Sequence, residues 1–278
     1  MKKLLLLVAI AIATMGQSFA KENTDTEFEK FLASSAEGLF NTQYIDLPYR
    51  YFTFNSGKGE APMLVVYLHD SKGNGQQNRE QMHQYGLKVV YDYLSRHSQN
   101  AILVVPQCRK DRYWYESYAT LGETMNKILY RFINDFIKER CIDKNRVYIM
   151  GSSSGGTGVW NMVSKYPKMF AAAMPVAAIA YKKYLSPSAV AKTPLCFVVC
   201  NDPKWVAKEK LIEMNSFIQL LKKYECKMNC AYLMDNLYNV INTSFSDDRL
   251  KWVFSQSRES LPDAGKHPVK GSKRKALL

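Results

Sequence analysis

The chain has 278 residues, long enough for one α/β domain with a buried core. After residue 20, no stretch is long and apolar enough to span a bilayer, and no internal repeat or low-complexity linker occurs, which excludes a membrane-spanning or repeat protein. The formal net charge is +13, and it becomes +11 (36 basic minus 25 acidic) once Lys2 and Lys3 are left out.

The first 20 residues have the pattern of a secretory signal peptide. Lys2 and Lys3 form a positive start, residues 4–14 are an apolar run, and residues 18–20 (SFA) resemble a cleavage site. We therefore expect a mature chain that begins near Lys21 and is secreted or periplasmic. Export argues against a nucleic acid as partner.

After a lead-in over residues 21–44, the predicted domain covers residues 45–256 and opens with three strands. Leu47–Phe54 alternates polar and apolar residues, which is typical of an antiparallel edge strand. Met63–Leu68 and Ala101–Val105 are continuously apolar, as strands covered on both faces are. A helix is expected between the last two.

The next predicted element is an amphipathic helix. Apolar residues recur at 3.6-residue spacing from Met125 to Ile137, which predicts one face packed on the sheet. Thr120 and Glu123 have the spacing of a capping box, so we expect the helix to begin there.

A nucleophile elbow is predicted at residues 151–155, whose sequence GSSSG matches the motif G-x-S-x-G. The motif follows the apolar strand Val147–Met150 and precedes a helical segment over residues 156–165, which is the context that this turn requires. Glycines leave room for the tight turn, and the turn lifts Ser153 above the carboxyl edge of the sheet. There it meets the positive end of the helix dipole.

Two more strands and two more helices complete the domain. Ala171–Val176 and Leu195–Cys200 are apolar strands, while Val206–Tyr224 and Arg249–Gln256 show helical spacing. Alternating strands and helices predict the α/β class, a mostly parallel central sheet with helices on both faces.

The last residues, 257–278, carry six basic side chains and two acidic ones. We interpret them as a disordered, solvated tail. A basic tail of this kind could also contact nucleic acid, anionic lipid or acidic polysaccharide.

Six cysteines occur after the signal peptide, and an oxidising compartment permits disulfides. Cys196 and Cys200 lie about 13 Å apart on one strand, too far to pair. Cys226 and Cys230 flank a turn and could bridge, whereas buried free thiols are the ordinary alternative. Zinc-binding spacing and hard-cation loops are absent from the sequence, so no metal and no organic cofactor is expected.

The chain resembles the secreted esterase branch of the α/β-hydrolases, which includes feruloyl and acetyl-xylan esterases and proteins like polyhydroxybutyrate depolymerase and dienelactone hydrolase. The resemblance covers residues 45–256 and implies the α/β-hydrolase fold. It is carried by Leu68-His69, Pro106-Gln107, Trp114, the run 145–156, Trp160, Tyr166-Pro167 and Phe170-Ala171-Ala172.

The resemblance implies roles for particular residues. Ser153 would be the nucleophile, and the backbone N–H of Ser154 would be one oxyanion donor. The second donor would come from Asp70 or Ser71. The family usually has His-Gly where this chain has His69-Asp70, and a carboxylate beside an oxyanion site disfavours negative charge.

The triad acid is expected after the strand Leu195–Cys200, where the resemblance places Asp202. Such an acid holds the tautomer of the histidine and stabilises the imidazolium. An Asx turn before Pro203 explains the same residue without a catalytic role.

The triad histidine is missing from its expected window. Residues 228–252 contain no histidine, and the family position falls on Leu237 or Tyr238. We interpret His69 as a structural loop residue and His83 and His97 as solvated residues on or beside a helix. The remaining histidine, His267, is in the tail.

Three hypotheses follow. The first is an exported serine hydrolase acting on small esters or acylated polysaccharide, with impaired or unusual catalysis because the histidine is missing. The second is a catalytically inactive hydrolase fold that binds a glycan or a protein, and the third is a secreted serine peptidase. The sequence does not decide the oligomeric state.

Overall fold

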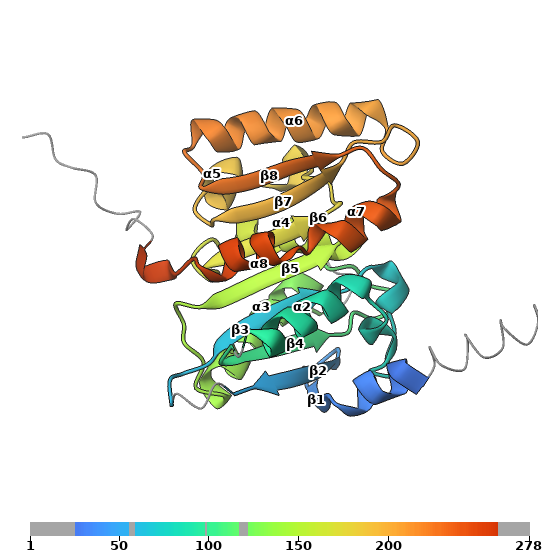
Figure 1. Cartoon of the computed structure of the whole chain (residues 1–278), viewed down its shortest axis with the longest axis vertical. Coiled ribbons are helices and arrows are strands. Elements are labelled where there is room, and N and C mark those ends of the chain that lie inside the picture. Colours follow the sequence, from blue (N-terminus) through green and yellow to red (C-terminus); the bar gives the residue numbers. More distant parts are fainter. Residues whose placement is uncertain (1–25, 56–58, 98, 117–121, 261–278) are drawn as a thin grey trace, which may run out of the picture.

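A computed structural model describes residues 26–55, 59–97, 99–116 and 122–260. The predicted signal peptide and most of the predicted tail lie outside these ranges. Eight strands form one sheet in the order β1-β2-β4-β3-β5-β6-β7-β8 (Figure 1). The sheet is antiparallel at β1-β2-β4 and parallel from β4 to β8, which confirms the predicted α/β-hydrolase fold.

The predicted strands are present, and two more flank them. The strands are β1 (Ala36–Phe40), β2 (Leu47–Phe54), β3 (Met63–Leu68), β4 (Ala101–Pro106), β5 (Val147–Ser152), β6 (Ala172–Val176), β7 (Leu195–Cys200) and β8 (Met228–Leu233). β2 is antiparallel as predicted, but the prediction of an edge strand is wrong because β1 pairs with its outer side. No residue of β1 is fully buried, so its sequence lacks the apolar run that reveals the other strands.

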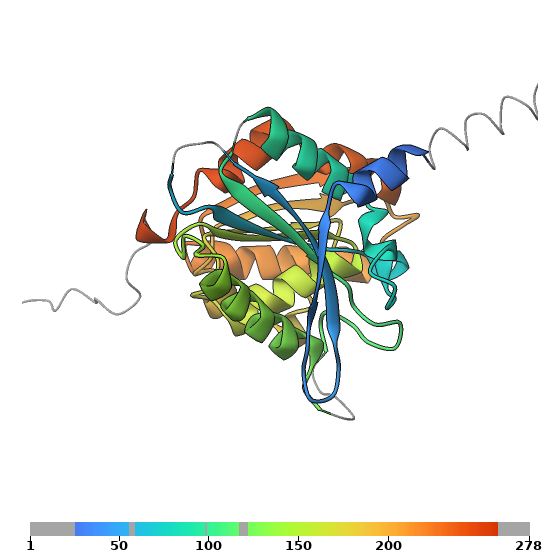
Figure 2. The same cartoon turned by 90° about the horizontal axis from the view of Figure 1, so that it is seen from below.

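Helices cover both faces of the sheet. They are α2 (Tyr85–Arg96), α3 (Met125–Glu139), α4 (Ser154–Lys165), α5 (Pro187–Val190), α6 (Lys208–Lys223), α7 (Leu237–Ser244) and α8 (Asp247–Phe254), preceded by helical residues 26–33. Short 3₁₀ turns are η1 (Ser71–Gly73), η2 (Glu80–Met82), η3 (Lys182–Tyr184) and η4 (Arg258–Ser260). Figure 2 shows helices on the two sides of the sheet. One apolar cluster joins α3, α4 and α6 to one face of the sheet, and a second joins α2 and α8 to the other.

The amphipathic helix α3 has the predicted buried stripe but a different start. Its first residue is Met125, and the extended residue Thr124 occupies the N-cap position. Glu123 thus precedes the helix, and its carboxylate contacts Nζ of Lys127, 2.7 Å away. Thr120 lies outside the described residues.

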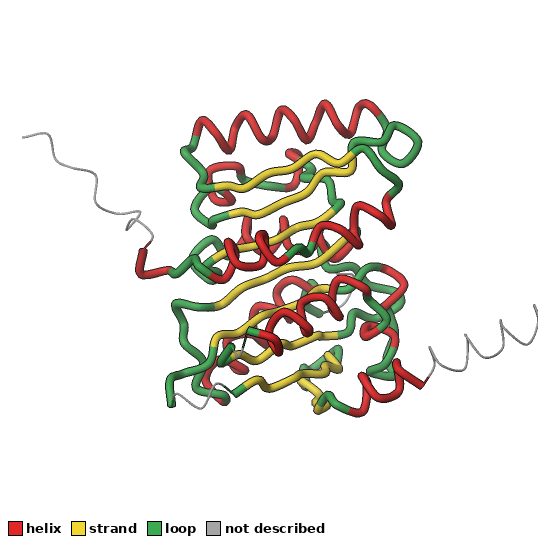
Figure 3. The backbone as a smooth tube through the Cα atoms, in the orientation of Figure 1, coloured by secondary structure: helices red, strands yellow, loops and turns green. Residues whose placement is uncertain are grey.

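Loops join each strand to its covering helix, and those after the parallel strands meet at one edge of the sheet (Figure 3). None of the helices in the described ranges is long and apolar enough to cross a membrane. At the other edge, the start of the predicted tail packs on the domain, because the Arg258 amide donates to the Asn145 carbonyl at 3.0 Å.

All six cysteines are free thiols. Cys226 and Cys230, for which a bridge was one alternative, do not pair. Cys226 is buried after α6, and its Sγ lies 3.7 Å from the Thr193 carbonyl oxygen. Burial raises the pKa of Cys226 to about 12 and that of Cys230 to about 11, so both stay protonated and unreactive at neutral pH.

Candidate active site

Ser153 lies on a strained turn between β5 and α4. Its backbone has φ 52° and ψ −121°, a region that residues with a Cβ rarely occupy. Strain of this kind costs on the order of 1–3 kcal/mol and persists only where the surroundings enforce it. Here the Ser153 amide donates to the Val176 carbonyl at 2.9 Å, which ties the turn to β6.

The glycines of the motif allow the turn to pack against β3. A Cβ on Gly155 would lie 2.1 Å from the Leu68 carbonyl oxygen, and a Cβ on Gly151 would lie 2.5 Å from the same atom. The backbone of the elbow therefore contacts the backbone of β3 on both sides of Ser153, and no residue larger than glycine fits at position 151 or 155. The structure thus has the strand, sharp turn and helix that the sequence motif predicts.

The Ser154 amide is the first of α4 and has no intrahelical acceptor, because the residue four positions earlier is in β5. It is therefore available to an anion beside Ser153. One turn later, the Thr157 amide and hydroxyl donate to the Ser153 carbonyl at 3.0 and 3.4 Å, which fixes the first turn of the helix.

Asp70, one of the two residues predicted for the second oxyanion donor, has its amide already engaged. The Asp70 amide donates to Oε1 of Gln84 at 3.3 Å, and Nε2 of Gln84 donates to Oδ1 of Asp70 at 3.2 Å. The same Oδ1 accepts from the Lys72 amide at 2.9 Å and caps η1. Asp70 would therefore have to release Gln84 before its amide could bind an oxyanion.

His69 is buried, and both of its ring nitrogens are used. Nδ1 donates to the Asp70 carbonyl at 2.6 Å, and Nε2 accepts from the Cys108 amide at 3.0 Å. Burial lowers the pKa of His69 to about 4, so the ring is neutral at pH 7. His69 therefore holds two loops together and has no free nitrogen for a proton transfer.

The other two described histidines also have contacts of their own. His83 stacks on Phe28 with ring centroids 3.5 Å apart, and His97 stacks on Tyr93 at 4.1 Å. Both rings are exposed, as predicted; His83 lies on the connection between β3 and α2, and His97 is the C-cap of α2. His267 lies outside the described residues.

Asp202 follows β7 at the carboxyl edge of the sheet, where the resemblance places the acid. Its Oδ1 accepts from the Lys204 amide at 2.9 Å, which is the Asx turn that was the alternative interpretation. Its backbone carbonyl accepts from the amides of Trp205 and Val206, both at 3.0 Å. Asp202 therefore stands at the position expected for the triad acid and also forms the Asx turn.

Tyr238 stands where the triad histidine was expected, in the first turn of α7. Its hydroxyl accepts from Nζ of Lys72 at 3.4 Å, and its ring centroid lies 6.0 Å from that of Trp205. The cluster Lys72–Trp205–Tyr238 joins the loops after β3, β7 and β8. The neighbouring Leu237 packs instead on the small apolar cluster of β7 and α7.

An aromatic cavity of about 410 Å³ opens beside the first turn of α4. The loop after β6 forms one wall and lies close to the elbow, since a Cβ on Gly156 would be 2.7 Å from Cβ of Ala178. Nζ of Lys210 lies 4.1 Å from the Tyr181 ring centroid. The lining residues are Tyr115, Thr157, Trp160, Asn161, Ile179, Tyr181, Lys183, Tyr184, Leu185, Lys210 and Glu213.

Trp160, one of the lining residues, carries a buried polar group that lacks a partner in the described part of the chain. The indole is 1% exposed, and within the described residues its Nε1–H has no acceptor. A buried donor without a partner is costly, and a ligand oxygen is one group that could satisfy it. This cavity was not predicted from the sequence, although Tyr181 and Tyr184, on the connection after the predicted strand Ala171–Val176, were a signal for it.

Comparisons with known proteins agree with the fold. Residues 110–186 match the family model of the prolyl oligopeptidases (Peptidase_S9). A search of curated protein sequences found no significant match.

Three solved structures illustrate the likeness. A thermostable esterase has a TM-score of 0.69 at 21% identity, covering 81% of this chain and 64% of the esterase, so this chain spans less than two thirds of it. A ferulic acid esterase has a TM-score of 0.61 at 15% identity, and the match covers 79% of this chain and 97% of the esterase. FphF, a fluorophosphonate-binding serine hydrolase of Staphylococcus aureus, has a TM-score of 0.58 at 16% identity, and the match covers 80% of this chain and 98% of FphF. The sheet order, the elbow and these matches together show that the chain has the α/β-hydrolase fold, in a form similar to that of esterases.

Proposed function

We propose that the protein is an exported serine hydrolase that cleaves carboxylic esters slowly, acting on small esters or on acyl groups of polysaccharide. The observation that carries this proposal is the strained elbow at Ser153, with its φ of 52°. In the proposed reaction, Oγ of Ser153 attacks the acyl carbonyl, the alcohol leaves, and water then releases the acid.

The missing histidine is the reason for expecting slow turnover. Removing the histidine of a serine triad lowers kcat by about 10⁶, while binding and the oxyanion site still leave about 10³–10⁴ over water. Tyr238 occupies the expected place and contacts Lys72, and neither side chain is the imidazole that a serine triad uses. The aromatic cavity would hold the acyl or alcohol group beside the elbow.

A fluorophosphonate probe tests this proposal without knowledge of the substrate. We expect the purified protein to be labelled slowly and Ser153→Ala not at all. Ser216→Ala, which changes an exposed serine on α6, is the matched control and should be labelled like the unchanged protein. Equal labelling of all three proteins would reject Ser153 as the nucleophile.

The second candidate is an inactive binding module. Two observations favour it: the absence of a histidine from residues 228–252 and the engagement of the Asp70 amide by Gln84. A folded protein that is not labelled even after hours, yet binds an acylated glycan, would support this function. The match to the prolyl oligopeptidase family keeps peptide bonds as a further substrate class, which peptide anilides would test beside esters.

A further inference from the structure

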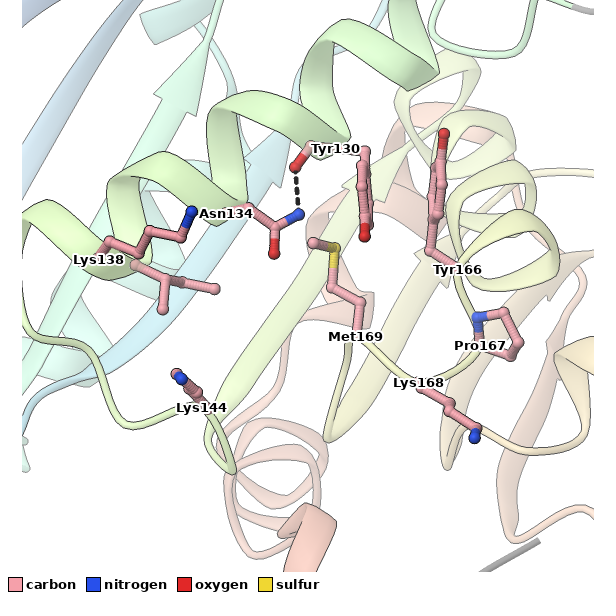
Figure 4. A pocket seen from close by; sticks show the side chains of 9 residues that line it. Tyr130, Asn134, Lys138, Lys144, Tyr166, Pro167, Lys168 and Met169 are labelled. Carbon is pink, nitrogen blue, oxygen red and sulfur yellow. Dashed lines mark hydrogen bonds between the residues drawn. The ribbon is translucent and has the colours of Figure 1, made fainter. Parts of the chain in front are cut away.

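A second hollow lies at the opposite edge of the sheet from Ser153, between α3 and the two connections that lead into β5 and β6 (Figure 4). Its volume is about 490 Å³, within the usual range of small-molecule sites. Lys144 precedes β5 and Lys168 precedes β6, so the hollow is at the amino ends of these strands. Ser153 follows the carboxyl end of β5, and the two sites are therefore separate.

The charge at the hollow is positive. Lys138, Lys144 and Lys168 border it, and none of its lining residues is an aspartate or glutamate. Lys138 forms one ion pair among the described residues: its Nζ lies 3.9 Å from Oδ1 of Asp135, and both side chains are exposed. Within the described part of the chain, Lys144 and Lys168 form no ion pair. Two ammonium groups without an ion pair, beside a third whose one ion pair is exposed and long, favour an anionic ligand.

One wall of the hollow is aromatic. The rings of Tyr130 and Tyr166 stack with centroids 4.0 Å apart and planes 15° from parallel, and Tyr130 is 36% exposed. Ile137 and Met169 add apolar surface. An exposed aromatic face binds flat ligands and the C–H groups of sugar rings, because its π-face is negative.

Asn134 adds an acceptor. Its Nδ2 donates to the Tyr130 carbonyl at 2.8 Å, which orients the amide and leaves Oδ1 turned toward the hollow (Figure 4). A ligand that matches this site therefore carries a hydroxyl donor as well as an anionic group and an apolar face. A simple aromatic acid lacks the hydroxyl, and a neutral sugar lacks the charge.

We propose that this hollow binds an acidic saccharide. The carboxylate or sulfate groups of the saccharide pair with Lys138, Lys144 and Lys168, a sugar ring lies against the tyrosine wall, and a hydroxyl donates to Asn134. Binding here is independent of the chemistry at Ser153, since the two sites are on opposite edges of the sheet.

Isothermal titration of Ser153→Ala tests the site without any hydrolysis. The probes are a galacturonic acid tetramer, its fully methyl-esterified form, and a sulfated tetramer of similar length. We expect the acid or the sulfated tetramer to bind at least about tenfold more tightly than the neutral ester. The ratio of acid to sulfated affinity identifies the anionic group.

Matched charge reversals locate the binding. Lys144→Glu with Lys168→Glu should weaken binding about tenfold or more, and Tyr130→Ala should weaken it without any change of charge. Lys222→Glu with Lys223→Glu makes the same change of net charge on exposed residues of α6 and should leave affinity unaltered. Equal weakening by the two double variants would show only diffuse attraction, and no binding of either anionic tetramer at millimolar concentration would also overturn the proposal.

Discussion

At the scale of single residues, His69 couples the stability of the protein to pH. Its pKa is about 4 in the folded protein, against 6.5 for a solvated histidine, so the unfolded state binds the proton more tightly. Stability is therefore complete above pH 6.5 and falls as the pH drops toward 4. Between pH 7 and pH 5 we expect His69 to remove about 2 kcal/mol from the free energy of unfolding. Urea titrations of the protein and of His69→Gln at both values measure this, and an equally steep loss in the variant would assign the effect to other groups.

At the scale of elements, α7 occupies the segment between β8 and α8 in which a histidine was expected. Tyr238→His places an imidazole in the cluster with Lys72 and Trp205, at the same edge as Asp202. We expect kcat/KM for p-nitrophenyl acetate to rise about tenfold or more, with a new ionisation near pH 6–7. Asp202→Asn in the Tyr238→His background should reverse most of the gain. Tyr238→Phe is the control, and an equal rise in that variant would mean that Tyr238 only obstructs the site.

At the scale of the whole molecule, most of the sheet could be predicted, whereas several details of the site could not. β3, β5 and β7 are buried on both faces, so continuous apolar runs reveal them. β1 has no buried residue, and its pairing with β2 depends on tertiary contacts. Ser153 could be predicted because the tight turn around it requires glycines at positions 151 and 155, which are visible in the sequence. The aromatic cavity was missed because its walls come from α4, α6 and separate loops, whose packing no single segment encodes.

The six free cysteines make a prediction about the whole molecule in an oxidising compartment. Burial raises the pKa of Cys108 and Cys196 and keeps these thiols protonated, whereas Cys141 is exposed. We expect the native protein to react rapidly with iodoacetamide at Cys141, and the protein denatured without reductant to react at all six cysteines. Mass spectrometry of protein recovered from the periplasm, with its first residue near Lys21, tests export and thiol state together. Loss of two reactive thiols from the denatured sample would instead mean that a disulfide forms on export, although all six thiols are free in the structure.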